Sequence, residues 1–376
     1  MEVIHFSQWY KELNGSNFLT IAGPCSAESE EQLYKTVEKL AAKHHPQVIR
    51  AGIWKPRTRP GSFEGVGERA LPWLKGVKEK YGFLTAVEVA KPDHVKAIMA
   101  IPGSVDIVWL GARTVTNPFS IQELAPYLKE LNLPVLVKNP LHPDLNLWIG
   151  ALERLNKAGI KKLAAIHRGF YPFENNKLRN IPKWEIPIEL KTEFPELPII
   201  GDPSHIAGDV CFIEEIAQKF LDLNFDGLMI EVHYNPAKAL SDAKQQLTPE
   251  EFDILIEDKL IFRHPQFGAD FINELDKYRT QIDSIDYQLL ELLSKRMELV
   301  KKIGDYKNEH QISLFQIDRW RKIRETRLAF GSKLNLNSDF ILKILEIVHK
   351  ESINIQSKQK NNDNKKEPNT DNQTTD

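Results

Sequence analysis

Two groups of residues in the first 265 positions combine types that could do chemistry together. The first group holds a thiol, an imidazole and two carboxylates, namely Cys25, His205, Glu231 and Asp242. Such a mixture suits Mn²⁺, Fe²⁺, Co²⁺ or Zn²⁺ better than Mg²⁺ or Ca²⁺. The group lacks the closely spaced ligand pairs of structural zinc sites, so spacing alone leaves a metal site and ordinary core positions equally open.

The second group is cationic and consists of Arg50, Lys55, Arg57, Arg113, Lys138 and Arg168. Each cation taken singly is compatible with a surface ion pair. Arg50, however, lies within an apolar segment that we predict to be a strand, and the other five lie at or just after the end of such a segment. If these ends meet at one rim, the converging cations need anionic substrates, and guanidinium groups in particular suit phosphate. We therefore predict a site for phosphorylated substrates beside the metal.

The elements that would position these residues are eight short apolar segments, each followed by a stretch with helical spacing. The segments span 18–23, 47–53, 83–89, 105–112, 134–138, 160–166, 197–202 and 226–233. They are apolar on both faces, which is typical of buried parallel strands, and the stretches between them are long enough for crossover helices. Eight such units in about 250 residues predict an α/β fold, the (β/α)8 TIM barrel, whose working residues follow the carboxyl ends of the strands. A doubly wound open sheet is the alternative, although no GxGxxG motif follows a strand.

The composition of the chain is that of an ordinary globular protein. Its 376 residues suggest two or three domains, and 41% of them are hydrophobic and 27% charged. A net charge of −2 argues against nucleic-acid or membrane partners and leaves small-molecule substrates as the expected ones. The sequence contains no membrane-spanning apolar stretch and no signal-peptide pattern. Because Cys25 and Cys211 are the only cysteines, we exclude a disulfide scaffold, expect a cytoplasmic location and assign Cys211 to the core.

The pattern changes after Pro265. Apolar residues from Leu275 to Tyr306 recur at alternating four- and three-residue steps, which is typical of the seam of one long helix that pairs with another chain. Further helices are predicted at 316–329 and 338–357, and the final residues contain nothing apolar and should be disordered. We thus expect a barrel domain over 1–265, a linker over 266–270, an all-α domain over 271–357 and a disordered tail over 358–376.

Seven motifs in order resemble the first type of 3-deoxy-D-arabino-heptulosonate 7-phosphate (DAHP) synthase, in the branch related to 3-deoxy-octulosonate 8-phosphate synthase. They are GPCS, RAGIWKPRTRPGSFEGVG, LGAR, VLVK, HRG, DPSH and DGLMIEVHYNPAKALSDAKQQL. The resemblance implies condensation of phosphoenolpyruvate with erythrose 4-phosphate on a metal-dependent barrel, the entry step of aromatic biosynthesis. The sister synthase carries a KANRSS-like segment where this chain has KPRTRPGS, which favours the four-carbon aldose.

The resemblance also implies roles for individual residues. Cys25, His205, Glu231 and Asp242 would bind one divalent metal ion, with Mn²⁺ expected first and Fe²⁺, Co²⁺ or Zn²⁺ as alternatives. Phosphoenolpyruvate would be held by Arg50, Lys55, Arg113, Lys138 and Arg168, and erythrose 4-phosphate by Arg57 and Thr58. Lys55 would also be catalytic, because it could move a proton. The chain departs from many members of the family at Asn139-Pro140 and at His167.

A second resemblance covers about residues 271–357. Arg279, Arg296, Lys307, Arg319, Ser352 and Gln356 match the pattern of the all-helical chorismate mutases. It implies an intertwined homodimer in which Arg279 enters the partner's site, and a metal-free rearrangement of chorismate to prephenate. These residues and Gln316 would bind chorismate and prephenate, with Lys307 and Gln356 as the catalytic donors to the ether oxygen. Gln316 stands where an acid is usual, and Trp320 where a glutamate is common.

We therefore expect a bifunctional cytoplasmic enzyme of aromatic amino acid biosynthesis that forms a homodimer through its helical domain, or a tetramer. A pathway's entry enzyme is usually inhibited by products, and we expect prephenate bound in the helical domain to inhibit condensation. The alternative is that the helical domain is a catalytically inactive module for dimerisation and ligand sensing on a DAHP synthase.

Overall fold

The protein, described by a computed structural model, divides into two compact units, Met1–Pro265 and Gln266–Asp376. The structure describes residues 1–42, 46–55, 63–172, 176–262 and 269–363. Arg57 and Thr58, which we expected to hold the aldose phosphate, lie outside the described residues. None of the described helices has the length and apolar character needed to cross a membrane.

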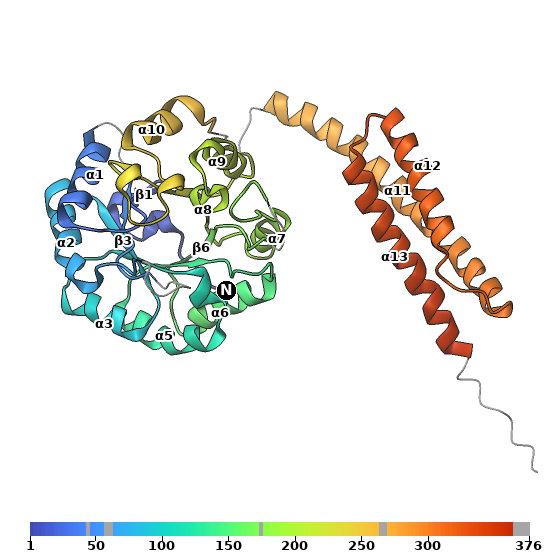
Figure 1. Cartoon of the computed structure of the whole chain (residues 1–376), viewed down its shortest axis with the longest axis horizontal. Coiled ribbons are helices and arrows are strands. Elements are labelled where there is room, and N and C mark those ends of the chain that lie inside the picture. Colours follow the sequence, from blue (N-terminus) through green and yellow to red (C-terminus); the bar gives the residue numbers. More distant parts are fainter. Residues whose placement is uncertain (43–45, 56–62, 173–175, 263–268, 364–376) are drawn as a thin grey trace, which may run out of the picture. The chain divides into compact units, whose positions relative to one another are not determined.

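Eight parallel strands close into a barrel in the first unit (Figure 1). The strands are β1 Leu19–Gly23, β2 Val48–Arg50, β3 Leu84–Val89, β4 Ile107–Leu110, β5 Val135–Lys138, β6 Leu163–His167, β7 Ile199–Gly201 and β8 Gly227–Glu231. β8 pairs with β1 and so completes the ring, with Glu231 opposite Gly23. This arrangement confirms the predicted TIM barrel and excludes the open sheet. Most strands are shorter than expected because their predicted end residues already belong to loops.

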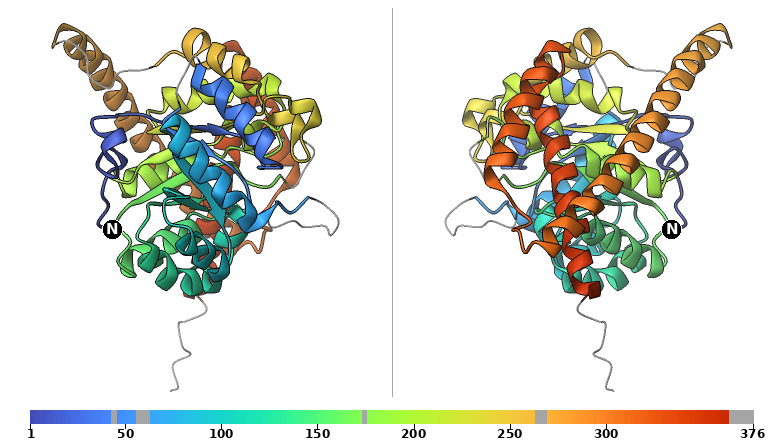
Figure 2. Two further views of the ribbon diagram at one scale, coloured as in Figure 1. Left: turned by 90° about the vertical axis from the view of Figure 1, so that its left-hand side faces the viewer. Right: turned by 90° about the vertical axis from the view of Figure 1, so that its right-hand side faces the viewer.

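Helices connect the consecutive strands and surround the barrel (Figures 1 and 2). The α-helices are α1 Glu30–Ala42, α2 Leu71–Tyr81, α3 Pro92–Ala100, α4 Ala112–Val115, α5 Pro118–Leu131, α6 Leu145–Lys157, α7 Glu185–Glu193, α8 Pro203–Ala207, α9 Ile213–Asp222 and α10 Pro249–Ile254. The 3₁₀ helices are η1 Phe6–Gln8, η2 Lys11–Leu13, η3 Gly67–Ala70, η4 Val210–Phe212, η5 Pro236–Lys238 and η6 Ala243–Gln245, and a π-helical turn, Leu255–Lys259, follows α10.

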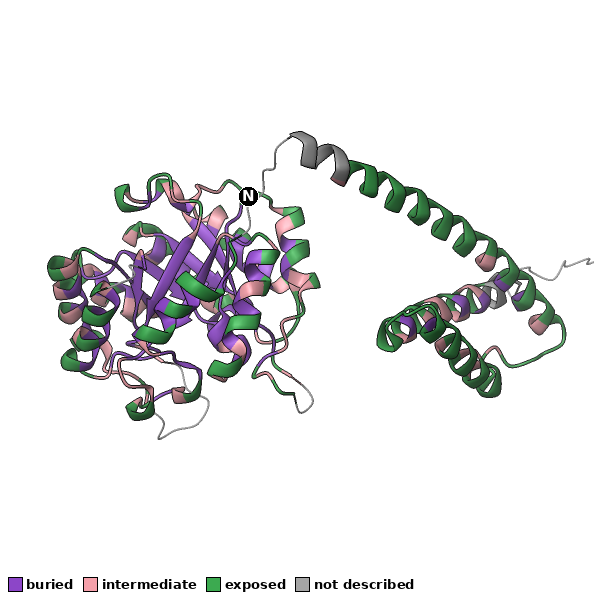
Figure 3. Cartoon of the chain, turned by 90° about the horizontal axis from the view of Figure 1, so that it is seen from above, coloured by how far each residue is buried: buried purple, intermediate pink, exposed green. Residues whose placement is uncertain are grey.

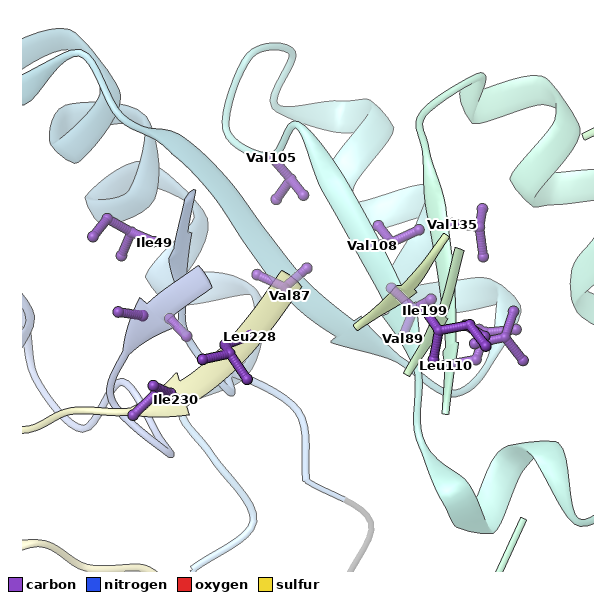
Figure 4. Packing of buried hydrophobic residues seen from close by; sticks show 14 of the residues in the cluster. Ile49, Val87, Val89, Val105, Val108, Leu110, Val135, Ile199, Leu228 and Ile230 are labelled. Carbon is purple, nitrogen blue, oxygen red and sulfur yellow. The ribbon is translucent and has the colours of Figure 1, made fainter. Parts of the chain in front are cut away.

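Side chains along each strand alternate between two apolar clusters. One cluster lies inside the barrel. The other lies between the strands and the outer helices, and Figure 4 shows part of it. On β2, Val48 belongs to the inner cluster and Ile49 to the outer one. Because successive side chains of a strand point to opposite faces, Arg50 must point inward. The same alternation on β5 directs Lys138 inward, so two cations enter the barrel at the carboxyl ends of their strands.

The second unit consists of three helices, α11 Ala269–Glu309, α12 Ile317–Lys333 and α13 Ser338–Asp363, among the residues described. α13 lies beside both α11 and α12 (Figures 1 and 2). Two expected boundaries differ from the structure. α11 begins inside the predicted linker, and α13 continues through 358–363, where we expected disorder. Lys358, Gln359 and Lys360 have good helix propensity and can extend an established helix without burying apolar surface. Hydrophobic patterning therefore does not reveal where this helix ends.

Much of the apolar seam of α11 is exposed within one chain. Residues 276–295 are exposed throughout (Figure 3). Ile282, Ile285 and Leu292 lie on the predicted seam and are 56%, 55% and 61% exposed. Packing inside the unit begins near Val300, which is 5% exposed. The first half of α11 therefore presents an apolar surface that the described part of the chain does not cover.

Candidate active sites

Five of the predicted cations line one cavity of about 200 Å³ at the rim of the barrel. They are Arg50, Lys55, Arg113, Lys138 and Arg168. Arg50 and Lys138 end their strands, whereas the others lie in the segments that follow β2, β4 and β6. The fold thus brings together cations that are distant in sequence, in a space suited to anionic substrates.

Trp109 of β4 lies beside two of these cations. The guanidinium carbon of Arg50 is 5.1 Å from the centre of the Trp109 ring, and Nζ of Lys138 is 5.9 Å from it. The indole Nε1 donates a hydrogen bond of 3.0 Å to Oε2 of Glu88. The buried ring therefore stabilises both cations by cation–π interactions. Sequence analysis did not identify Trp109, because an apolar residue within a strand carries no signal of such a role.

Three of the four predicted metal ligands form a compact cluster. Ligand atoms of Cys25, Glu231 and Asp242 lie within 4.8 Å of one another. The thiol Sγ of Cys25 donates a hydrogen bond of 3.2 Å to Oδ2 of Asp242. Glu231 stands at the end of β8, and Asp242 follows in a loop, where its backbone is left-handed with φ of 49°. One sulfur and two carboxylate ligands at these distances could hold a divalent transition-metal ion.

His205 approaches this cluster from α8. Its Nε2 is 3.7 Å from Oε1 of Glu231. Its Nδ1 is 2.9 Å from Oδ1 of Asp202, whose Oδ2 accepts a hydrogen bond of 2.9 Å from Lys138. A carboxylate that accepts a hydrogen bond from Nδ1 orients the imidazole so that Nε2 can face a metal. This role of Asp202 was not predicted, although the DPSH motif places Asp202 three residues before His205.

The pKa values of two of the three acids in this cluster, Cys25 and Asp242, are shifted in opposite directions. Burial and Glu231 raise the pKa of the Cys25 thiol to about 12, although Nζ of Lys55, 2.6 Å from Sγ, lowers it. Burial alone would raise the pKa of Asp242. The positive charge of the Arg179 guanidinium is the largest of several opposite effects that together outweigh burial, so this pKa lies below its ordinary value. At neutral pH the thiol is therefore protonated and Asp242 ionised, so metal binding must displace the thiol proton.

Two residues that we did not identify from the sequence support the carboxylates. Nη1 of Arg179 donates a hydrogen bond of 3.0 Å to Oδ1 of Asp242 and also contacts Gln245. Nε2 of Gln245 donates a hydrogen bond of 2.7 Å to Oε2 of Glu231. Gln245 could have been found, because it stands in the quoted motif that contains Asp242. Arg179 lies between β6 and α7, where the sequence offers no comparable signal.

Arg168 is held through both its backbone and its side chain. Its backbone N–H donates a hydrogen bond of 2.7 Å to Oδ1 of Asn139, and its Nη1 donates one of 3.0 Å to Oδ1 of Asn180. Nδ2 of Asn139 in turn donates a hydrogen bond of 2.8 Å to the carbonyl oxygen of Gly169. Burial lowers the pKa of Arg168 to about 10, so it remains cationic at neutral pH. The departure at Asn139 thus positions Arg168.

His167, the second departure from the family pattern, does not line the cavity. It is fully buried, and its ring lies 6.3, 5.7 and 5.8 Å from the rings of Trp148, Phe170 and Phe220. Burial lowers the pKa of His167 to about 3, which keeps it neutral. Because Ile166 belongs to the inner cluster, His167 points to the opposite side of β6 and belongs to the packing of the outer layer.

The assignment of Cys211 to the core is wrong. Cys211 lies in η4 and is exposed. Its backbone N–H donates a hydrogen bond of 3.1 Å to Oδ1 of Asp209. The buried face of α9 begins only at Ile213, so the turn before it faces solvent.

In the helical unit, Arg296 of α11 meets Ser352 of α13. Nη1 of Arg296 donates a hydrogen bond of 2.7 Å to Oγ of Ser352. Gln356 lies one turn further along α13, and its buried Oε1 has no hydrogen-bond partner among the described residues. Nζ of Lys307 donates a hydrogen bond of 2.7 Å to the carbonyl oxygen of Leu314, and burial lowers the pKa values of both Arg296 and Lys307. These partly buried cations and polar groups could bind an anionic ligand.

The other predicted residues of this unit are less buried. Gln316 is the N-cap residue of α12 and lines an apolar pocket together with Lys307. Arg319 is exposed on α12, and Arg279 is exposed on α11, where it pairs with a neighbouring aspartate of the same helix. Arg279 precedes Arg296 by 17 residues on this continuous helix. At 1.5 Å per residue they are about 25 Å apart, so one chain does not bring them together.

A parallel barrel with a cationic cavity at the carboxyl ends of its strands defines an α/β barrel enzyme for anionic substrates. Residues 4–261 match the model of the DAHP synthetase I family, and residues 278–357 match that of chorismate mutase type II. The chain belongs to the DAHP synthetase I family and also carries a type II chorismate mutase domain. Both resemblances identified from the motifs are confirmed, and the two domains place the protein in aromatic biosynthesis.

Three comparisons give the extent of the likeness. The chain is 32% identical over 247 residues to the phospho-2-dehydro-3-deoxyheptonate aldolase of Thermotoga maritima. The aligned region covers 66% of this chain and 70% of that protein. The crystal structure of the DAHP synthase from Thermotoga maritima matches with a TM-score of 0.58 and covers 65% of this chain and 68% of that one. A 2-dehydro-3-deoxyphosphooctonate aldolase of Desulfatibacillum aliphaticivorans is 25% identical over 272 residues. The aligned region covers 66% of this chain and 93% of that protein.

Proposed function

We propose that the barrel condenses phosphoenolpyruvate with D-erythrose 4-phosphate to give DAHP and inorganic phosphate, with the help of one divalent metal ion. The observation that carries this proposal is the cavity itself. Arg50, Lys138 and Arg168 surround a space that also reaches Cys25 and Asp242. Cations for a phosphorylated enol acid and ligands for a metal thus border the same volume.

Arg168 and Arg113 would bind the phosphate of phosphoenolpyruvate. Arg168 is cationic and already held by Asn139 and Asn180. A guanidinium that is oriented before the substrate arrives loses little conformational freedom on binding. Lys138 is held in the same manner by Asp202 and would contact the substrate carboxylate.

Lys55 would hold and move a proton between the two parts of the site. Its Nζ is 3.0 Å from the carbonyl oxygen of Cys25 and 2.6 Å from the thiol Sγ, and it lines the cavity. It therefore reaches both the metal ligands and the space for the substrate. A group within hydrogen-bond distance of the reacting atoms is the geometric requirement for general acid–base catalysis.

Cys25, His205, Glu231 and Asp242 would hold the metal. One buried atom supports the fit of a metal ion to these residues. Oε1 of Glu231 lies 3.0 Å from Nη2 of Arg50, but it accepts no hydrogen bond of good geometry from the described residues. Mn²⁺ is the expected ion, and Fe²⁺, Co²⁺ and Zn²⁺ also suit this ligand set. When bound, such an ion supplies a Lewis acid for a carbonyl oxygen.

The test is the release of phosphate from phosphoenolpyruvate with erythrose 4-phosphate or arabinose 5-phosphate, before and after removal of metal with EDTA and readdition of Mn²⁺. We expect a higher kcat/KM with erythrose 4-phosphate and a loss of activity that Mn²⁺ restores. A higher kcat/KM with the five-carbon sugar would contradict the proposed substrate, and full activity in EDTA would contradict the metal.

We propose that the helical unit rearranges chorismate to prephenate as a homodimer in which Arg279 of one chain enters the site of the other. Two observations support the dimer. Arg279 is about 25 Å from Arg296 along one helix, and the seam around Ile285 and Leu292 is exposed in the single chain. An antiparallel partner helix would cover this seam, and two such dimers could form a tetramer. Light scattering should give at least twice the mass of one chain, and a monomer would contradict the proposal.

An inactive helical unit that only dimerises and senses ligands is the second candidate. It is favoured by Gln316, which occupies the N-cap position of α12 where an acid is usual, and by Trp320, whose ring stacks on that of His349 with a centroid distance of 4.2 Å. An amide can still bind a hydroxyl group, so we place the mutase first. Steady-state loss of chorismate with the intact protein decides between them, because only an active mutase consumes chorismate.

We further propose that prephenate inhibits condensation when it binds in the helical unit. Such coupling requires that prephenate bind more tightly to one functional state of the protein than to another. Arg296→Ala should therefore abolish inhibition of condensation by prephenate while leaving the uninhibited rate unchanged. Inhibition that persists in this variant would place the inhibitor on the barrel.

A further inference from the structure

α13 presents three polar side chains on one face, because His349, Ser352 and Gln356 are spaced by three and four residues. Ser352 accepts the hydrogen bond from Arg296 described above. The other two carry buried atoms that have no hydrogen-bond partner among the described residues, namely Nε2 of His349 and Oε1 of Gln356. Buried polar atoms of this kind are rare unless a ligand, water or partner completes them.

The ring of His349 is held in place by α12. Trp320 stacks on it with a centroid distance of 4.2 Å and an interplanar angle of 13°, and Phe315 lies 5.9 Å away. A stacked ring has little rotational freedom, so the direction of Nε2 is set before any ligand binds. A ligand oxygen that accepted a hydrogen bond from this nitrogen would satisfy a buried polar atom that is already oriented.

The electrostatic surroundings of His349 keep it neutral. Burial lowers its pKa, and the positive charges of Arg296 and Lys307 lower it further. Arg296 lies at this face of α13, because its Nη1 is hydrogen-bonded to Ser352, which is three residues after His349. A neutral imidazole still offers one N–H donor, which suits an oxygen of an anionic ligand held by the two neighbouring cations.

We propose that His349 is a further substrate-binding residue of the chorismate mutase site, in which its Nε2–H donates a hydrogen bond to an oxygen of the bound dicarboxylate. This inference rests on the mutase function proposed above. It assigns Trp320 the role of a positioning residue that holds the imidazole. His349 would thereby add one neutral N–H donor to the site, on the face of α13 that also carries Ser352 and Gln356.

The test uses the full chain with His349→Phe and His349→Gln. Phenylalanine keeps a ring against Trp320 and removes the nitrogen, whereas glutamine can carry an N–H donor to the same depth. We expect His349→Phe to raise KM for chorismate and Kd for prephenate by about tenfold, as for loss of one hydrogen bond to a charged oxygen. Because the bond serves ground state and transition state alike, kcat should change by less than about threefold. His349→Gln should keep both constants within about threefold of wild type.

His310→Phe is the matched control, because His310 also stacks on an aromatic ring, that of Tyr306 at 4.2 Å, but is exposed. It should leave KM and Kd unchanged. If His349→Phe binds as tightly as wild type while wild type is active, His349 is a packing residue and this inference fails alone. If His349→Phe instead changes the oligomeric mass, Nε2 serves the subunit interface and the inference also fails. A wild-type chain that neither consumes chorismate nor binds prephenate would overturn both the inference and the mutase function.

Discussion

Asp202 is the residue whose replacement should reveal most about how the barrel site is built. Its carboxylate accepts hydrogen bonds from Nζ of Lys138 at 2.9 Å and from the backbone of His205 at 3.1 Å, and lies 2.9 Å from Nδ1 of the same histidine. It is fully buried. One carboxylate thus holds both Lys138, the cation that we propose binds phosphoenolpyruvate, and His205, a proposed metal ligand. Asp202→Asn removes the charge and keeps the shape.

Two effects of Asp202→Asn can be given a size. Removing one charge of a buried ion pair lowers the free energy of unfolding by about 3–5 kcal/mol. Because the amide of Asp202→Asn keeps one acceptor oxygen, we expect a smaller loss of about 2–3 kcal/mol. For a domain of this size the barrel should melt about 5–10 °C lower. Loss of the partner that orients a histidine ligand typically lowers metal affinity by about 10–100-fold. KM for phosphoenolpyruvate should rise as well, since Lys138 loses its anchor.

The pH dependence follows from the pKa of Asp202. Burial alone would raise it, but His205 and Lys138 hold it well below its ordinary value. A depressed carboxylate pKa contributes stability that is complete above the unfolded value and is lost only as pH falls through the folded one. The stability difference between wild type and Asp202→Asn should therefore stay constant between about pH 6 and pH 8.

The assay combines calorimetric melting, Mn²⁺ titration and phosphate-release kinetics. Asp209→Asn is the matched control, because Asp209 caps the exposed turn at Cys211 away from the cavity. It should leave metal affinity and KM unchanged. If Asp202→Asn keeps both metal affinity and KM for phosphoenolpyruvate within about twofold of wild type, Asp202 does not orient these ligands and the reasoning is refuted.

Further expectations concern the metal and the independence of the two sites. EDTA, and likewise Cys25→Ala, should abolish condensation and spare chorismate rearrangement, because the proposed ligands belong to the barrel; loss of both activities would contradict this. Since metal binding displaces the proton of a thiol whose pKa is raised to about 12, Mn²⁺ affinity should increase with pH between about 6 and 8, and a flat titration would mean that the thiol keeps its proton or does not bind. Arg296→Ala should lower chorismate turnover by at least about a hundredfold through loss of a charge that holds a substrate carboxylate, with condensation as the internal control; retained turnover would make Arg296 structural.

The two departures from the family pattern illustrate how far motif comparison extends. Both Asn139 and His167 are neighbours of cations in the sequence, and both could have been substrate contacts. The structure separates them, because Asn139 binds the backbone of Arg168 while His167 packs among aromatic rings on the other side of β6. The two residues have different roles because successive side chains of β6 point to opposite faces and because the loop after β5 brings Asn139 to Arg168. Only the alternation of side chains along a strand can be recognised in the sequence.

The barrel, the three helices and the cations near the strand ends could all be predicted from the sequence. Apolar segments of strand length predict the fold and place Arg50 and Lys138 on strands, because these are local properties of the chain. The closed barrel decides which face of each strand is the inner one, and it directs both cations inward because Val48 and Leu136 belong to the inner cluster. Only the tertiary structure decided which groups complete the site. Asp202 meets Lys138 across 64 residues and Arg179 meets Asp242 across 63, through loops that have no periodicity. Such pairings depend on where the ring of strands brings loop ends together, and no local pattern encodes that distance.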